Sequence, residues 1–477
     1  MAPVDAVVTP AGFGSGLRAM TSVVLDALAA GAEQRGGPLP AGGPEAVTRR
    51  VSAALGELLP EHGDGPDSAL RDLTTVLAAG AADPSDPYCA AHLHVAPLAV
   101  AAAADFAASV LNPSMDSWDQ APAASVIEQA VTDALAALVY PRAARPDALI
   151  TSGGTESNLI ALLLTREQLR GTGPIQVVCG ANAHHSIGRA AWLLGLPNPI
   201  VLDCPTGRLS PASVDRALRD LPQPAVVVAT AGTTDEGLID PLPELAEVAS
   251  AHGARLHVDA AYGGPLLFSA ELAPRLTGID AADTVSFDLH KLGWQPVASG
   301  ILAVREATTL TGLRIRADYL NAADDTAAGL PDLLGRSLRT SRRPDAFKVA
   351  VTMRALGRRG IAMLIEHCVH TAEALAAAVD AHPGLRRRPG EIGISTVLLR
   401  PVEADWAGGE PGDELVAAIR RRLLHDGTAV LGRAAAADAD GQHRLWLKIT
   451  LLHPQASADR FDTLLDLISS AAGTLAR

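Results

Sequence analysis

The chain is predicted to be an α/β protein with a mostly parallel, doubly wound sheet, a smaller C-terminal α/β domain and an N-terminal helical arm. From about residue 86 to about residue 345, short apolar segments alternate with helical stretches, which is the pattern of a parallel sheet covered by helices. Hydrophobic residues make up 48% of the 477 residues and aromatic residues only 3%. Alanine, leucine and valine must therefore form most of the core, as in a buried sheet between alanine-rich helices.

Six short apolar segments are expected to be strands of this sheet. They are 148–151, 176–179, 225–230, 256–259, 285–287 and 300–304. Before them, helical stretches separated by pieces rich in glycine and proline predict an arm. After them, two helices and two strands predict a second α/β unit. These elements are 347–356, 361–379, 396–399 and 445–452. We therefore expect an arm over 1–85, a large domain over 86–345 and a small domain over 346–477.

Lysine is rare in this chain and occurs only at Lys291, Lys348 and Lys448. Lysine can lose its proton and become a nucleophilic amine, which arginine cannot do. Lys291 follows His290 at the end of the segment Ser-Phe-Asp-Leu-His-Lys. Most lysines are solvated surface charges, so this pair alone is weak evidence for catalysis.

Two further segments place polar groups at the carboxyl ends of expected strands, where open α/β sheets bind ligands. Asp259 ends one strand and is followed by small residues. The strand 148–151 runs into a turn, Ser-Gly-Gly-Thr-Glu-Ser-Asn, and then into an apolar-periodic helix over 159–170. A glycine turn at a helix N-terminus offers free N–H groups and a positive dipole end to a phosphate.

These three parts match the needs of pyridoxal phosphate, which are a lysine for its aldehyde, a carboxylate for its pyridine nitrogen and a cradle for its phosphate. Lys291 is the candidate for the aldehyde, and Gly154 with Thr155 is the candidate for the phosphate. Asp259 is the candidate for the nitrogen, because an adjacent negative charge favours the protonated pyridinium that accepts electrons. Each part alone has a simpler explanation, since Asp259 could cap a helix and the glycines could form an ordinary turn.

Six motifs follow one another in a fixed order along the chain. They are the segments 112–123, 153–158, 183–190 and 229–234, the Asp259 strand and the His290-Lys291 pair. In this order and spacing the chain, from about Asp86 to its C-terminus, resembles the group II pyridoxal-phosphate-dependent amino-acid decarboxylases. The resemblance implies the aspartate aminotransferase-like fold, fold type I, and pyridoxal 5'-phosphate as the cofactor.

Within this resemblance, His184 is expected to stack on the cofactor ring. His185 is a rival, and the family pattern of His, any residue, then Ser favours His184. The resemblance also implies that Thr234 steadies the histidine, that Ala261 lies beneath the ring and that His290 lies near the phosphate and the substrate. The alternative is that the two histidines are hydrogen-bonded core residues.

The family protonates the decarboxylated product from a tyrosine on a mobile loop, and Tyr319 matches that position. The following segment, 322–329, lacks apolar periodicity and is expected to be a flexible lid. The resemblance further implies a homodimer, in which the N-terminal arm wraps the partner subunit and the lid reaches the partner's active site. Tyr319 could instead anchor its own loop.

The segments 288–296 and 335–343 resemble the branch of the family that acts on diaminobutyrate and, in siderophore pathways, on lysine. The predicted reaction is decarboxylation of a basic L-amino acid, with L-lysine to cadaverine first and L-2,4-diaminobutyrate, ornithine or another amino acid as alternatives. The second amine of such a substrate needs a carboxylate or carbonyl partner. Asp116 and Asp119 are candidates, although either could cap the next helix. His453 stands where the family commonly has Asn, which leaves a detail of the C-terminal domain open.

Two other functions are less favoured. Oxidative decarboxylation and deamination to an aldehyde occurs in relatives that have replaced the loop tyrosine, and Tyr319 is retained. A cofactor-binding assembly subunit without turnover would be expected to have lost Lys291, Asp259 or His184, and all three are retained.

Charge and cysteine content argue against other classes. The formal net charge of −14 disfavours nucleic-acid binding, and the four cysteines form no CxxC pair, so neither a disulfide framework nor a metal site is expected. Residues 95–111 are apolar, but Pro97 and Asp105 interrupt them, so a buried helix is expected rather than a membrane span. The first ten residues lack the pattern of a secretory signal. We expect a cytoplasmic enzyme that binds a small amino-acid substrate and neither nucleic acid nor membrane.

Overall fold

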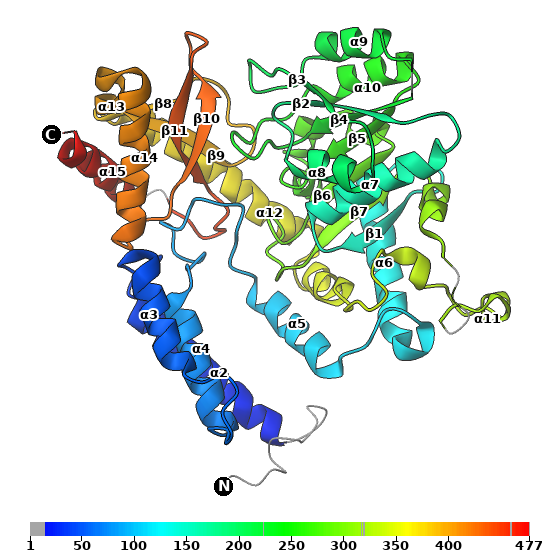
Figure 1. Cartoon of the computed structure of the whole chain (residues 1–477), viewed down its shortest axis with the longest axis horizontal. Helices are drawn as coiled ribbons and strands as arrows, with labels where there is room; N and C mark the ends of the chain where they lie inside the picture. Colours follow the sequence, from blue (N-terminus) through cyan, green and yellow to red (C-terminus); the bar gives the residue numbers. More distant parts are fainter. Residues whose placement is uncertain (1–14, 223, 316, 318–319, 458–459, 477) are drawn as a thin grey trace.

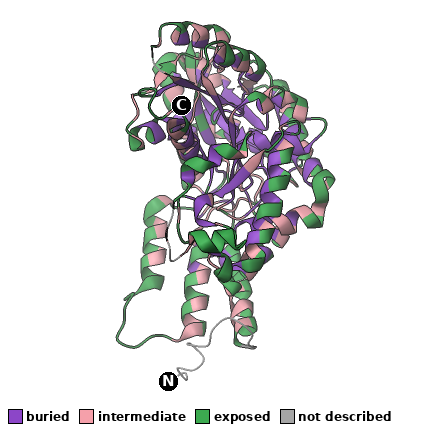
Figure 2. Ribbon diagram, turned by 90° about the vertical axis from the view of Figure 1, so that its right-hand side faces the viewer, coloured by how far each residue is buried: buried purple, intermediate pink, exposed green. Residues whose placement is uncertain are grey.

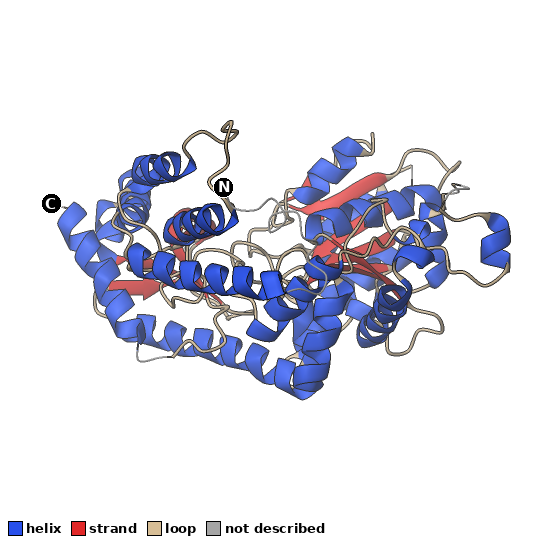
Figure 3. Ribbon diagram, turned by 90° about the horizontal axis from the view of Figure 1, so that it is seen from below, coloured by secondary structure: helices blue, strands red, loops and turns tan. Residues whose placement is uncertain are grey.

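The computed structural model of the chain describes residues 15–222, 224–315, 317, 320–457 and 460–476. These described residues form two sheets, one of seven and one of four strands, with the long helix α12 (Ala346–Ala381) between them (Figure 1). Seen from below, the strands lie in two separate groups surrounded by helices (Figure 3). The body of the molecule therefore consists of a large and a small α/β part.

The large sheet has the strand order β1-β7-β6-β5-β4-β2-β3. Its strands are β1 (Asp147–Thr151), β2 (Gln176–Gly180), β3 (Ile200–Leu202), β4 (Ala225–Thr230), β5 (Arg255–Asp259), β6 (Thr284–Asp288) and β7 (Gly300–Val304). Neighbouring strands are parallel except where β7 pairs with β1 and with β6. The sheet is thus mostly parallel and contains all six expected strands. The sequence pattern did not predict β3, a three-residue edge strand without a fully buried residue.

Helices cover both faces of the large sheet. They are α6 (Pro122–Val139), α7 (Gly154–Gln168), α8 (Ser186–Leu193), α9 (Pro211–Arg219) and α10 (Leu242–Ala251). Successive strand residues point to opposite layers: Val177 packs in one core cluster with Leu162 of α7, whereas Val178 packs in another with Leu245 of α10. The fold class predicted from the alternation of strands and helices is therefore present.

The small sheet is antiparallel and has the order β10-β11-β9-β8. Its elements are β8 (Leu385–Arg387), β9 (Thr396–Pro401), α13 (Val402–Ala407), α14 (Gly409–His425), β10 (Gly432–Ala437), β11 (His443–Thr450) and α15 (Phe461–Leu475). The expected strands correspond to β9 and β11. The sequence of β10 is glycine, arginine and four alanines, which is a composition depleted in strands, so it was missed.

Short 3-10 helices link several of these elements. They are η1 (Trp118–Gln120), η2 (Gly264–Phe268), η3 (Ala273–Leu276), η4 (Ile279–Ala281), η5 (Ala307–Leu313) and η6 (Leu334–Arg336). Helix α12 is interrupted at Gly357, which has the non-helical angles φ 63° and ψ 174°. This left-handed φ suits glycine and separates the two helices that were expected over 347–356 and 361–379.

Three helices project from the body at its N-terminal side, and Figure 2 shows that most of their surface is exposed. They are α2 (Ser15–Arg35), α3 (Gly43–Leu55) and α4 (Pro66–Gly80). A Cβ atom added to Gly31 of α2 would lie 2.5 Å from the carbonyl oxygen of Thr75 in α4. Glycine therefore allows the two helices to touch. The division of the chain at residues 85 and 345 stays a prediction.

One local expectation needs correction, and a second segment has structure that the sequence pattern did not predict. The helix over the apolar segment, α5 (Ala99–Leu111), is only half-buried: Ala101 and Ala104 face the core, whereas Phe106 and Leu111 are 46% and 70% exposed. The segment 322–329, expected to be a flexible lid, contains a short exposed helix, α11 (Ala323–Ala327), and its role as a lid stays a prediction. Alanine and acidic residues near the helix start suffice to form one turn there.

Two of the described helices, α6 and α12, are long and apolar enough to cross a membrane. Each carries a buried charge that is paired inside the protein. Glu128 of α6 contacts Arg342, and Lys348 of α12 contacts Asp105 and Asp345. These pairs show that both helices pack as core helices of the α/β body.

The pair between Glu128 and Arg342 is expected to support the segment that precedes α12. Its two contacts measure 2.5 and 2.7 Å, and both residues are almost completely buried. Replacing Glu128→Gln leaves the buried guanidinium without a counter-charge, which we expect to cost about 3 kcal/mol or more. A lower urea midpoint would show this loss. The matched variant Asp280→Asn breaks a pair with the exposed Arg142, and its midpoint should stay unchanged. Equal midpoints for the two variants would contradict the prediction.

Candidate active site

A cavity of about 390 Å³ lies at the carboxyl ends of β1, β4, β5 and β6, beside the N-terminus of α7. This is the edge at which open α/β sheets bind ligands. Eight residues expected from the sequence line it, namely Gly154, Thr155, His184, Thr234, Asp259, Ala261, His290 and Lys291. The ninth, Tyr319, lies outside the described residues. The structure thus brings residues from widely separated segments to one place.

The turn between β1 and α7 keeps the start of the helix open to the cavity. Gly153 has φ 150° and, as the N-cap, has no side chain with which to cap the helix. A Cβ atom on Gly153 would meet His290 Cε1 at 3.0 Å, and one on Gly154 would meet Ala261 Cβ at 3.0 Å. Larger residues would fill this space. The N–H groups of the first helical turn and the positive end of the dipole therefore suit a phosphate.

Asp259 ends β5 and is 5% exposed. Its Oδ2 accepts a hydrogen bond from Asn158 Nδ2 at 2.7 Å, and its Oδ1 accepts one from the backbone N–H of Ala261 at 3.1 Å. These donors replace part of the water that a charged carboxylate loses on burial. Asp259 is thus a fixed negative charge at the cavity wall, as a pyridine nitrogen would require.

Lys291 shares a carboxylate with its neighbour His290. Lys291 Nζ lies 2.9 Å from Asp288 Oδ2, and His290 Nε2 lies 3.6 Å from the same oxygen. Asp288 ends β6 and is 2% exposed. Burial lowers the pKa of His290, and the nearby Asp288 opposes that shift. The lysine amine is therefore placed in the cavity next to a group that can hold its proton.

The two adjacent histidines differ in their position relative to the cavity. His184 is half-buried and lines the cavity, whereas His185 is exposed and does not line it. His184 Nδ1 lies 2.8 Å from Ser186 Oγ, and burial lowers the pKa of the His184 ring. A neutral, flat ring at the wall of the cavity suits stacking on an aromatic cofactor.

Among the lining residues not expected from the sequence are two basic side chains. Lys448 comes from β11 of the small sheet, and its Nζ donates to the carbonyl oxygen of Thr234 at 2.9 Å. His92 comes from the segment before α5. Burial lowers the pKa of both side chains. The rarity of lysine was a signal for Lys448, but sequence spacing does not place it beside Lys291.

Other expected residues lie elsewhere. Asp116 and Asp119 do not line the cavity of their own chain. Asp116 is buried with an Oδ1 that has no partner among the described residues, whereas Asp119 is exposed in the first turn of η1. His453 accepts a hydrogen bond from the backbone N–H of Gln455 at 3.0 Å and so supports a turn outside the cavity.

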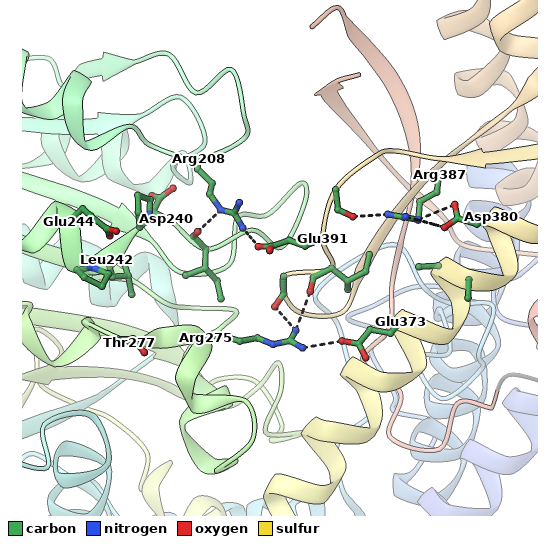
Figure 4. A pocket seen from close by; sticks show the side chains of 18 residues that line it. Arg208, Asp240, Leu242, Glu244, Arg275, Thr277, Glu373, Asp380, Arg387 and Glu391 are labelled. Carbon is green, nitrogen blue, oxygen red and sulfur yellow. Dashed lines mark hydrogen bonds and ion pairs between the residues drawn. The ribbon is translucent and has the colours of Figure 1, made fainter. Parts of the chain in front are cut away.

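A larger groove of about 960 Å³ lies between the large and small parts (Figure 4). Its three labelled arginines are all paired, Arg208 with Glu391, Arg275 with Glu373 at 3.0 Å and Arg387 with Asp380 at 3.1 Å. Matched charges leave little attraction for a charged ligand. Neither Lys291 nor Asp259 borders this groove, so the chemistry belongs to the smaller cavity.

The residues of that cavity fit pyridoxal phosphate. Besides the lysine, the carboxylate and the open helix start, the wall contains Thr230, whose buried Oγ1 has no partner among the described residues. Buried hydroxyl groups normally have one, and a bound group can supply it. Within the described part of the chain, no cluster of three or more His, Cys, Asp or Glu residues is arranged to hold a metal ion.

The fold and the cavity are those of a pyridoxal-phosphate-dependent enzyme. The chain belongs to the pyridoxal-dependent decarboxylases, because residues 49–386 match the family model described as the pyridoxal-dependent decarboxylase conserved domain. It is 39% identical to the L-2,4-diaminobutyrate decarboxylase of Rhizobium meliloti (strain 1021), a match that covers 87% of this chain and 84% of that protein. It is 30% identical to the L-2,4-diaminobutyrate decarboxylase of Acinetobacter baumannii, over 81% of this chain and 80% of that one.

Solved structures agree with this assignment. The glutamate decarboxylase domain of a diaminobutyrate-pyruvate transaminase and L-2,4-diaminobutyrate decarboxylase from Vibrio parahaemolyticus has a TM-score of 0.82 at 28% identity, with 96% of each chain covered. The Oryza sativa protein TDC, solved with PLP and tryptamine, has a TM-score of 0.86 at 22% identity, with 98% of this chain and 99% of that one covered. The second likeness shows the fold alone. The protein is a pyridoxal-phosphate-dependent amino-acid decarboxylase of fold type I.

The two lysines of the cavity can be distinguished by experiment. We expect borohydride treatment of the cofactor-loaded protein to attach the cofactor irreversibly to Lys291, because this amine adjoins Asp288 while Lys448 is engaged by a carbonyl oxygen. Peptide mapping by mass spectrometry should find the label on residue 291. Lys291→Ala should abolish the labelling, and the matched variant Lys448→Ala should retain it. Label on residue 448 would contradict the assignment.

Proposed function

We propose that the enzyme decarboxylates a basic L-amino acid, with L-2,4-diaminobutyrate as the first candidate substrate and L-lysine as the second. From the sequence, lysine was expected first and diaminobutyrate was an alternative, because the segments 288–296 and 335–343 resemble the one branch that includes both activities. The observation that changes the order is the name shared by the two relatives that are 39% and 30% identical, both L-2,4-diaminobutyrate decarboxylases. A siderophore pathway and ornithine remain alternatives, and the chain is proposed to act in the cytoplasm.

The cofactor supplies an electron sink when it is bound. Asp259 is proposed to hold its pyridine nitrogen, and the start of α7 with Gly154 and Thr155 is proposed to hold its phosphate. His184 is proposed to lie flat on one face of the ring, with Ala261 beneath the other. Each of these groups lines one cavity, and each lies in or next to an element that packs on the large sheet, which favours a fixed arrangement.

The two lysines are proposed to have different tasks. Lys291, held at 2.9 Å from Asp288, is the amine that carries the cofactor and can pass a proton to that carboxylate. Lys448 is a partly desolvated cation whose pKa is lowered by burial, so an anionic partner would stabilise its charge. The α-carboxylate of the substrate is such a partner. Lys448 is therefore proposed to orient the substrate together with Thr234 and His290.

Tyr319 is proposed to protonate the product carbon from its loop, as the family resemblance implies, with the lid over 322–329 excluding water. The second ammonium of the substrate needs a carboxylate. The two described carboxylates of the cavity, Asp259 and Asp288, already have partners. If Asp116 or Asp119 contacts that ammonium, it does so from the other subunit of a dimer.

A panel of amino acids tests the proposed reaction. Purified enzyme with pyridoxal phosphate should release carbon dioxide and 1,3-diaminopropane from L-2,4-diaminobutyrate with a higher kcat/KM than it releases cadaverine from L-lysine. Chromatography of the amines measures both. Lys291→Ala is the inactive control. If the enzyme releases no amine from any of the amino acids, the proposal is wrong and an assembly subunit is favoured. If it releases peroxide, ammonia and an aldehyde in place of the amine, the reaction is the oxidative one.

A homodimer is proposed from the exposed apolar side chains of the projecting helices, which include Leu25 of α2 and Leu77 of α4 at 61% and 70% exposure. Apolar surface of this kind marks interaction sites. Sedimentation equilibrium should give about twice the chain mass of 49.1 kDa. Leu77→Glu should shift the protein toward the monomer, and Trp406→Glu, which alters an exposed residue of the small part, should not. A wild-type monomer at micromolar concentration would refute the dimer.

A further inference from the structure

Asn158 is a completely buried residue of α7 at the wall of the same cavity. Its amide nitrogen donates to Asp259 Oδ2 at 2.7 Å and to Ser186 Oγ at 2.9 Å. Its amide oxygen accepts from Ser286 Oγ at 2.8 Å and from His257 Nε2 at 2.9 Å. A side-chain amide has two donor hydrogens and two acceptor lone pairs. The full hydrogen-bonding capacity of Asn158 is therefore used inside the protein.

The carboxylate of Asp259 determines the orientation of the Asn158 side-chain amide. A carboxylate only accepts hydrogen bonds, so the NH₂ group of Asn158 has to face Asp259 and its oxygen has to face His257. His257 must then carry its proton on Nε2 and accept the hydrogen of Thr284 Oγ1, 2.8 Å away, on Nδ1. Burial lowers the pKa of His257 to about 4. The ring is neutral at pH 7, as this arrangement requires.

A second branch runs from Asn158 to His184 through Ser186. Ser186 Oγ accepts from Asn158, so its own hydrogen goes to His184 Nδ1, 2.8 Å away. The backbone N–H of Ser186 lies 3.3 Å from the same ring nitrogen and also donates to it. Two donors at Nδ1 place the proton of the neutral His184 ring on Nε2. The tautomer of His184 is thus set by Ser186, and the hydroxyl of Ser186 is set by Asn158.

We infer that Asn158 is a positioning residue that fixes both the carboxylate of Asp259 and the ring orientation and tautomer of His184 through one buried amide. This inference rests on the proposed roles of Asp259 and His184 at the cofactor. The two residues come from different elements, the end of β5 and the turn before α8. Asn158 contacts the first directly and reaches the second through a single hydroxyl group.

The two branches differ in what they control. The bond to Asp259 has a charged acceptor, and such bonds are stronger than those between neutral groups. Loss of this bond weakens the interaction between Asp259 and the cofactor nitrogen. The bond to Ser186 joins neutral groups, and its loss leaves the Ser186 hydroxyl free to turn away from His184 Nδ1. A change at Asn158 therefore affects both properties, whereas a change at Ser186 affects the ring alone.

Three variants of the full-length enzyme test this branching. In Asn158→Leu, the leucine side chain is similar in size to asparagine but has no hydrogen-bond donor. We expect this variant to raise the dissociation constant of pyridoxal phosphate about tenfold or more. It should also change the visible circular dichroism of the bound cofactor. Ser186→Ala should change the circular dichroism and lower kcat but leave the dissociation constant within about threefold. Thr165→Val is the matched control, because it removes a buried hydroxyl of the same helix that bonds only to Ala161, and it should leave all these properties unchanged.

Asn158→Asp gives a second route to the same answer if the leucine variant does not fold. The aspartate keeps an acceptor for His257 but turns an acceptor toward Asp259, so it should also weaken cofactor binding. Thermal unfolding monitors the fold of each variant. The inference is overturned if the folded Asn158 variants bind the cofactor as tightly as Thr165→Val does, or if Ser186→Ala leaves the circular dichroism unchanged.

Failure of this inference and failure of the proposed function give different results. If the wild-type enzyme releases no amine, the function is wrong, yet the dissociation constants of the variants still report on Asn158. If the wild type decarboxylates and the folded Asn158 variants match the control, the function stands and the amide is only structural. In a double variant, Asn158→Leu with Ser186→Ala, the change in circular dichroism should be smaller than the sum of the two single changes, because Asn158→Leu already leaves the Ser186 hydroxyl without the bond that fixes it. Additive changes would contradict a common branch.

Discussion

The site depends on one constraint, which is that four parallel strands of the large sheet end at the same edge: the neighbours β4, β5 and β6, and β1 on the far side of the antiparallel β7. Thr151, Thr230, Asp259 and Asp288 are the last residues of β1, β4, β5 and β6. A helix that starts directly after one of these strands points its positive end at the same edge. Separate segments of the chain therefore meet there without long loops. The surrounding strands are fully buried, so the polar groups at their ends have few ways to move.

The sequence predicted the parts of the fold that bury the most apolar surface. All six strands expected in the large sheet exist, because a strand buried on both faces is a continuous apolar run. The strands that were missed lack this signal: β3 and β8 have three residues each and lie at the edges of their sheets, and β10 is built mostly from alanine. The exposed half of α5 was missed for the opposite reason, since the apolar side chains of Phe106 and Leu111 face outward. The amino-acid composition does not show whether another surface covers these two side chains.

The site was predictable where each residue follows directly from a strand end or a glycine turn. This applies to Gly154, Asp259 and Lys291, whose chemistry is recognisable in a short segment. Lys448 and His92 reach the cavity from the small sheet and from the segment before α5, and only the packing of the two α/β parts brings them there. Hydrogen-bond partners are still harder to read from a sequence. The contact between Asn158 and Asp259 spans 101 positions of the chain.

The environments of the two cavity lysines explain how one small space can hold two amines with different properties. Lys291 has the carboxylate of Asp288 at 2.9 Å, which stabilises a positive charge on the amine. Lys448 has a neutral carbonyl at 2.9 Å, with the carboxylate of Asp235 only at 4.0 Å, so its charge is poorly compensated by the protein. An anion entering the cavity is therefore attracted to Lys448 more than to Lys291. The placement of one aspartate thus gives the two amines of the cavity different electrostatic surroundings.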